Sequence, residues 1–303
     1  MTVSASNEHH RLPLPHILLA LAVVAVWGSN FVVIKIGLQH LPPLLFAALR
    51  FSLAFLPAAL FLHRPPVPWS NLAAYGLLIG SGQFALLFLA MRSEISPGLA
   101  SLVIQTQVFF TLLLAMRLAN ERVRGFQWLA LALAAAGLGV IVVHTDGSTT
   151  PLGLAMVLAA AFCWACGNIV GKRAGTVNMP AYVVWSSLFA APPLIALALL
   201  VEGPARVWQG LSQADAATWG AVLWQTVGNA FFGYGVWGWL LARHPAPTIV
   251  PMALLVPVFG MSSAALLLGE PLPGWKLGAA ALVMAGLALN LLWPRIRQWR
   301  AAA

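Results

Sequence analysis

Uncharged polar side chains lie deep inside long apolar segments of this sequence, where they are candidates for binding a solute. Trp164 and Asn168 are spaced i, i+4, and Trp27 and Asn30 are spaced i, i+3, so each pair shares one face of a helix. An amide surrounded by lipid costs free energy unless it meets a partner or water. We therefore predict a set of substrate-binding residues: Trp27, Asn30, Gln83, Gln105, Trp164, Asn168, Gln225, Asn229, Tyr234 and Trp237.

Two interpretations of these polar residues remain open on the sequence alone. Asn and Gln commonly join helices to each other by hydrogen bonds, which is a structural role. Alternatively, the amides line a water-filled cavity, with aromatic side chains such as Trp27 and Tyr234 forming walls that suit apolar or cationic groups. For any single aromatic residue, packing against lipid is the alternative.

Charged side chains are rare inside the apolar segments. Arg50 is the charge that lies clearly within one, and a buried Arg is a functional-site hypothesis by default. The alternative is structural: Arg50 pairs with a carbonyl or carboxylate, or extends towards the interface. Glu121 and Glu270 each follow an apolar segment, where a carboxylate can meet the positive end of the following helix dipole.

Every acidic residue and every His falls in a tail, a loop or a helix end. A proton relay inside a membrane normally uses buried Asp, Glu or His, so this distribution indicates a facilitator driven by the solute gradient. A membrane hydrolase would also need such groups at depth. Cys163 and Cys166 lie in an apolar segment without further ligands, so we interpret them as small apolar side chains. We expect no metal, no cofactor and no catalytic residue.

The composition indicates which elements hold these residues. Hydrophobic residues make up 61% of the 303-residue chain and charged residues 8%, and the mean hydropathy is +0.88. Soluble domains carry about 25% charged residues, so we predict an all-α integral membrane protein. A spanning helix needs about 20 apolar residues. Ten segments qualify, at roughly 16–38, 43–62, 70–91, 96–118, 124–143, 152–172, 180–201, 217–241, 246–268 and 274–293.

The net charge of +9 does not indicate nucleic-acid binding, because the 16 Lys and Arg residues are spread over the gaps between apolar segments. Counted by loop, these residues concentrate on one side of the predicted membrane. The exceptions are Lys35, Arg92, Arg206 and Lys276, together with Arg50 within a helix. The positive-inside rule therefore predicts cytoplasmic N- and C-termini. The first apolar segment is too long for a signal-peptide core, and we interpret it as a permanent helix.

The two halves of the chain resemble each other. Trp27 and Lys35 match Trp164 and Lys172 at a constant offset, and Glu121 matches Glu270 within a longer run of small residues. Five helices in each half predict one membrane domain built from two inverted repeats, at about 16–143 and 152–293, with the binding site at their interface. Proline removes a backbone donor and bends a helix, so we predict gating roles for Pro97, Pro251 and Pro257. A static kink is the alternative.

Five plus five helices, the W-x-x-N of Trp27 and Asn30, Arg50 in the second helix and Glu at the ends of the fourth and ninth resemble the EamA-type drug/metabolite transporters. Within that superfamily the chain is most similar to the YddG-type exporters of aromatic and other neutral amino acids. The resemblance implies a bacterial inner-membrane exporter with a central cavity that opens alternately to each side. The small multidrug-resistance relatives carry a coupling Glu in their first helix, and this chain has no acidic residue there.

From the resemblance and the residues together we expect a transporter of amino acids or related small metabolites, with the lipid bilayer as its surroundings and no nucleic-acid partner. The alternatives are an exporter of drug-like aromatic cations or of another metabolite, and an intramembrane lipid-modifying enzyme. The sequence does not identify the solute or the oligomeric state.

Overall fold

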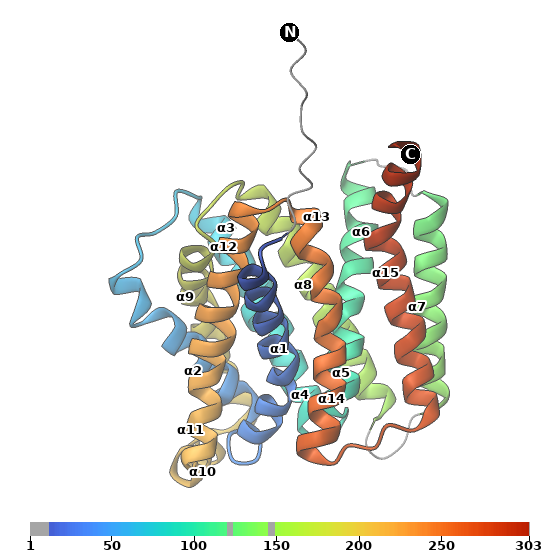
Figure 1. Cartoon of the computed structure of the whole chain (residues 1–303). Coiled ribbons are helices and arrows are strands. Elements are labelled where there is room, and N and C mark those ends of the chain that lie inside the picture. Colours follow the sequence, from blue (N-terminus) through green and yellow to red (C-terminus); the bar gives the residue numbers. More distant parts are fainter. Residues whose placement is uncertain (1–11, 120–123, 145–148, 303) are drawn as a thin grey trace.

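The computed structural model describes residues 12–119, 124–144 and 149–302, and these residues form helices without a β-strand. Most of the helices run side by side with their long axes aligned (Figure 1). The start of α1 (Leu14–Gly37) and the end of α15 (Gly274–Ala302) lie towards the same end of this bundle. The opposite end carries the short helix α10 (Pro204–Gln213) and the loop that leads into α15.

The helical segments of the first half follow the predicted spans closely. After α1 they are α2 (Pro43–Phe55) with the 3-10 helix η1 (Ala58–Leu60); α3 (Trp69–Tyr75), the π-helix η2 (Gly76–Gln83) and α4 (Phe84–Ser93); α5 (Pro97–Val103), the 3-10 helix η3 (Ile104–Thr106) and α6 (Gln107–Ala119); and α7 (Gly125–Val143).

The second half repeats this pattern. It contains α8 (Pro151–Arg173); α9 (Met179–Leu197) with the π-helix η4 (Ala198–Glu202); α10; α11 (Ala216–Leu223), the π-helix η5 (Trp224–Tyr234) and α12 (Gly235–Arg243); α13 (Ala246–Ile249), the 3-10 helix η6 (Val250–Leu255) and α14 (Val256–Leu268); and α15.

Within the described residues, nine helical segments are long and apolar enough to cross a membrane, at the positions of nine of the ten predicted spans. The remaining predicted span, 217–241, coincides with the continuous helical run from α11 to α12. That run contains Gln225, Asn229 and several Trp and Gly residues, which lower its hydropathy. The membrane-spanning class is therefore confirmed, and the count of ten helices stays a prediction.

The prediction that Pro97 bends the fourth span is wrong, because Pro97 is the first residue of α5. The N–H of a first residue has no intrahelical partner, so proline is tolerated there without a bend. The irregular part of this span is η3 instead. The ninth span does change its helix type, and Pro251 and Pro257 lie in the first turns of its segments η6 and α14.

Glycines allow η2 to pack directly against α9. A Cβ atom on Gly76 would lie 2.1 Å from the Ser186 carbonyl oxygen, and one on Gly80 would lie 2.3 Å from the Ala190 Cβ. Real Cβ contacts are not this short, so a larger side chain at either position would push the two helices apart. Close approach through small residues is typical of helix pairs in membranes.

Two buried carboxylates stabilise helix starts at the end of the bundle opposite the termini. Glu202, the last residue of η4, accepts hydrogen bonds from the backbone N–H groups of Leu44 (2.7 Å) and Leu45 (3.1 Å) in the first turn of α2. A carboxylate at a helix N-terminus satisfies free N–H groups and interacts favourably with the helix dipole. Glu202 thus joins the seventh predicted span to the second.

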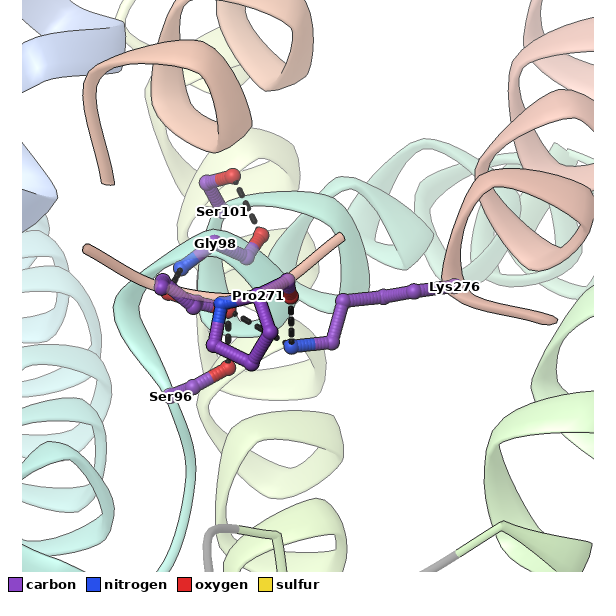
Figure 2. A network of polar contacts seen from close by, with 6 residues as sticks. Ser96, Gly98, Ser101, Pro271 and Lys276 are labelled. Carbon is purple, nitrogen blue, oxygen red and sulfur yellow. Dashed lines mark hydrogen bonds and ion pairs between the residues drawn. The ribbon is translucent and has the colours of Figure 1, made fainter. Parts of the chain in front are cut away.

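Glu270 acts in the same way on α5, in the first half of the chain. Its carboxylate accepts hydrogen bonds from the Ser96 hydroxyl (2.5 Å), the Gly98 N–H (2.9 Å) and the Lys276 ammonium (2.9 Å). Lys276 also donates to the Pro271 carbonyl at 3.1 Å. Ser96, Gly98 and Lys276 surround this network in Figure 2.

The sequence interpretation of Glu270 named the wrong helix. It placed the carboxylate at the start of the following helix, α15, whereas the carboxylate lies at the start of α5. The physical reason is tertiary packing: α14 lies against α5, which brings the end of the ninth span to the start of the fourth. Glu121, the matching residue, lies outside the described residues.

Candidate functional site

A cavity of about 360 Å³ lies between the helices of the two halves. This volume falls within the range of about 300–1,000 Å³ that is typical of small-molecule sites. Its polar lining consists of the hydroxyl-bearing residues Thr111 and Tyr234 and of six amides: Asn30, Gln83, Gln105, Gln107, Asn168 and Asn229. Its aromatic lining consists of Trp27, Phe31, Phe84, Trp164 and Tyr234.

The structure brings eight of the ten predicted substrate-binding residues to this cavity: Trp27, Asn30, Gln83, Gln105, Trp164, Asn168, Asn229 and Tyr234. The other two, Gln225 and Trp237, do not line the cavity but contact residues that do. Gln225 is fully buried and donates to the Asn30 carbonyl oxygen at 2.7 Å. The Trp237 ring packs on Trp27 with 5.2 Å between the ring centroids.

The amides of α1 and η5 form a short chain of hydrogen bonds. The Gln225 side-chain NH₂ donates to Asn30, and the Gln225 carbonyl oxygen accepts from Asn229 at 3.3 Å. Gln225 therefore fixes two cavity-lining amides from two different helices. The two interpretations left open by the sequence both apply here, because Asn30 and Asn229 join helices and line the cavity as well.

A second polar group lies where α6 faces α8. The Asn168 side-chain NH₂ donates to the Gln107 carbonyl oxygen at 2.8 Å and to the Thr111 hydroxyl at 3.2 Å. These bonds fix the orientation of Asn168, because its nitrogen donates and its oxygen is left as an acceptor. The cavity therefore presents amide groups from both halves of the chain.

Aromatic packing positions the wall formed by α1 and η5. The Trp27 indole N–H donates to the Asn229 backbone carbonyl at 3.3 Å, and its ring lies 5.6 Å from that of Tyr234. A Cβ on Gly233 would lie 2.3 Å from the Trp27 indole nitrogen, so glycine is needed here for the indole to approach η5. A rigid aromatic wall results.

The prediction of site residues omitted several members of the lining. Gln107 is absent from the predicted set, although its i+4 neighbour Thr111 supports it, since that spacing places both on one helix face. Phe31 and Phe84 carry no signal that distinguishes them from other Phe residues of apolar helices. The structure is needed to find them.

Among the described residues, the cavity lining contains no Asp, Glu, His, Lys or Arg. Arg50 does not line the cavity, but its guanidinium carbon lies 3.7 Å from the ring centroid of the lining residue Phe84. No group of three or more His, Cys, Asp or Glu residues with metal-site geometry occurs in the part of the chain that the structure describes. The site can therefore bind through amide hydrogen bonds and aromatic faces.

The chain resembles known membrane transporters along most of its length. The EamA-like transporter family matches it twice, at residues 14–143 and 151–292. A protein from Salmonella typhimurium named "Probable amino-acid metabolite efflux pump" is 45% identical over 286 residues, covering 92% of this chain and 96% of that protein. A protein of the same name from Escherichia coli strain K12 is 42% identical over 290 residues, with 94% and 96% coverage.

A more distant relative is also named as a transporter, and a solved structure shares the fold. The "Uncharacterized inner membrane transporter YedA" of Escherichia coli is 32% identical over 202 residues, covering 63% of each chain. A solved chain described as "Crystal structure of protein" superposes with a TM-score of 0.61 at 20% sequence identity and covers 93% of this chain and 98% of its own. At that identity the likeness concerns the fold alone.

Proposed function

Because the chain belongs to the EamA-like transporter family, we propose that it exports amino acids or amino-acid metabolites through the central cavity by alternating access. The observation that carries this proposal is the cavity itself, a pocket of amides and aromatic rings inside an apolar helical bundle. Amides match the ammonium and carboxylate groups of an amino acid with donors and acceptors. Aromatic rings accommodate the side chain. The names of the relatives with 45% and 42% identity support the substrate class.

We further propose that transport is facilitated by the solute gradient and requires no proton. A proton-coupled carrier needs a titratable group that meets the solute pathway. Among the described residues, the cavity lining has no carboxylate or imidazole. Glu202 and Glu270 are instead occupied by hydrogen bonds to helix starts at one end of the bundle.

The architecture that fits this mechanism has ten spans in two inverted halves within one membrane domain. The second and seventh spans are joined by Glu202, and the fourth and ninth by Glu270. These spans occupy equivalent positions in the two halves. Inverted repeats of this kind place the substrate at their interface. Movement of one repeat against the other opens the site to each side of the membrane in turn. Pro251 and Pro257 lie where the ninth span changes its helix type, and we keep a gating role for them as a proposal, together with Pro97 at the start of α5.

Thiol labelling tests the proposed orientation, with both termini in the cytoplasm of a bacterial cell. The background variant carries Cys163→Ala and Cys166→Ala, and a single cysteine is then introduced as either His63→Cys or Arg206→Cys. The native side chains at both positions are exposed. We expect a membrane-impermeant maleimide to label Arg206→Cys in intact spheroplasts. We expect it to label His63→Cys only after permeabilisation. Labelling of His63→Cys from outside would contradict the orientation.

Counterflow in proteoliposomes tests the proposed function. Vesicles loaded with one unlabelled amino acid are diluted into a trace of the same labelled compound, for a panel of alanine, serine, leucine and phenylalanine. We expect transient accumulation of label for at least one of them and none in empty vesicles. Accumulation of an aromatic cation such as ethidium, with no amino-acid flux, would instead favour the drug-export alternative.

A further inference from the structure

Arg50 is a buried cation whose donors are not all used. It lies in α2 and is 2% exposed, and its Nε and Nη1 atoms have no hydrogen-bond partner. The ion pairs found among the described residues join Lys276 to Glu270 and His40 to Asp215, and neither involves Arg50. An Arg inside a membrane protein is costly unless it is paired. The presence of a buried Arg50 without an ion pair to any described residue therefore requires an explanation.

Two aromatic rings lie against the Arg50 guanidinium. The guanidinium carbon lies 3.7 Å from the ring centroid of Phe84 and 4.9 Å from that of Phe51. Such contacts stabilise the positive charge through the ring face. They do not use the N–H donors, which lie in the plane of the guanidinium and match a carboxylate with two parallel hydrogen bonds.

Phe84 and Tyr234 separate Arg50 from the central cavity. Both side chains line the cavity, and both also line a second space of about 20 Å³ beside Arg50. That space holds about one water molecule, which is too little for a carboxylate. The hydroxyl-bearing residues Tyr75, Ser186 and Ser187 also line this space. A movement of the Phe84 ring would join the two spaces and bring the guanidinium into contact with a bound solute.

The backbone around Phe84 and Tyr234 suits such a movement. Phe84 directly follows the π-helix η2 (Gly76–Gln83), and Tyr234 is the last residue of the π-helix η5 (Trp224–Tyr234). π-Helices are rare and are found frequently at functional sites. Here two of them end at the two rings that separate the cation from the cavity.

We propose that Arg50 anchors the carboxylate of the transported solute, which it reaches when Phe84 turns aside in the occluded state. This inference deepens the proposed function and rests on it for the route of the solute. It assigns the substrate class as a carboxylate-bearing small molecule. The amides of Asn30, Asn168 and Asn229 then meet the rest of the solute.

A binding assay on the purified protein tests the inference. Its result does not depend on passive permeation of the probes through a membrane. Ligand binding is followed by quenching of tryptophan fluorescence, since Trp27 and Trp164 line the cavity. The probes are the amino acid with the largest counterflow, its carboxamide, propionate and chloride. They are used at a pH below the α-amino pKa, where acid and carboxamide differ mainly in the carboxylate. The variants are Arg50→Gln and Arg50→Lys.

We expect the wild-type protein to bind the acid about 10- to 100-fold more tightly than the carboxamide, as for a charge-assisted hydrogen-bonded pair. Arg50→Gln should abolish this ratio by weakening the acid alone, whereas Arg50→Lys should keep part of it. Arg64→Gln is the matched control, because Arg64 also lies over an aromatic ring, at 4.5 Å from Trp69, but is exposed. It should leave the ratio unchanged.

Three results would overturn the assignment: no preference for the acid in the wild-type protein, a preference that survives Arg50→Gln, or Arg50-dependent quenching by chloride with none by carboxylates. The first needs no variant, so it holds even if the variants fail to fold. Amino-acid counterflow that persists alongside any of these would leave the proposed function intact. Conversely, Arg50-dependent binding of propionate without any amino-acid flux would support the anchor and contradict the amino-acid substrate.

Discussion

Replacing Glu270 by Gln should lower the free energy of unfolding by about 3–5 kcal/mol, the usual cost of removing one partner from a buried ion pair. The side chains of Glu270 and Lys276 are 7% and 3% exposed. Gln carries no charge, so the Lys276 ammonium stays buried with neutral oxygens, such as the Pro271 carbonyl, as its acceptors. The hydroxyl of Ser96 and the N–H of Gly98 also lose a charged acceptor. Denaturant unfolding in mixed micelles measures the loss.

Asp215→Asn provides the matched control for this substitution. Asp215 also accepts hydrogen bonds at a helix start, from the hydroxyl and the backbone N–H of Thr218, and these bonds lower the pKa of its carboxyl. Its side chain is 55% exposed, and Asn caps helices about as well as Asp, so little stability should be lost. Adding Lys276→Met to Glu270→Gln should recover part of the loss, because it removes the unpaired charge. Equal stabilities of Glu270→Gln and Asp215→Asn would show that the buried pair contributes nothing.

Replacing Gln225 by Leu should reduce transport by about 10- to 100-fold, although Gln225 does not line the cavity. The substitution removes the hydrogen bonds that hold Asn30 and Asn229, which do line it. Leaving buried amide groups without a partner costs about 1–3 kcal/mol, and 1.4 kcal/mol corresponds to a factor of ten. We expect the loss in the apparent affinity for the solute, measured by counterflow over a range of solute concentrations.

Gln209→Leu is the control, since Gln209 is exposed on α10 and neither lines the cavity nor belongs to the amide chain. It should transport like the wild-type protein. A Gln225→Leu variant that reaches the same protein level and keeps the wild-type apparent affinity would show that the amide chain does not position the site.

Much of the candidate site could be predicted because polar residues inside apolar helices have few alternatives. An amide such as Asn168 must face a partner or a cavity, and here it does both. The partner itself could not be predicted. Gln225 and Asn30 are separated by 195 positions, and the pairing depends on how η5 packs against α1. For the same reason the sequence identified Glu270 as a helix-capping residue but named the wrong helix.

Other features leave no trace in residue type. The role of Phe84 depends on its position between Arg50 and the cavity. The sequence does not indicate this position, because Phe residues are common in apolar helices. The π-helices arise from a local change in hydrogen-bond register, which hydropathy does not report. The sequence left the role of Arg50 open between structure and function. The structure places its charge beside the cavity wall with unused donors.

A cavity whose described lining contains no acidic residue should carry the solute down its own gradient. The deciding measurement is uptake of the labelled amino acid into proteoliposomes under clamped voltage, first with equal internal and external pH and then with the two offset. We expect the internal concentration to rise to the external level and no further in both conditions. Accumulation above the external level that follows the pH gradient would contradict transport without a proton.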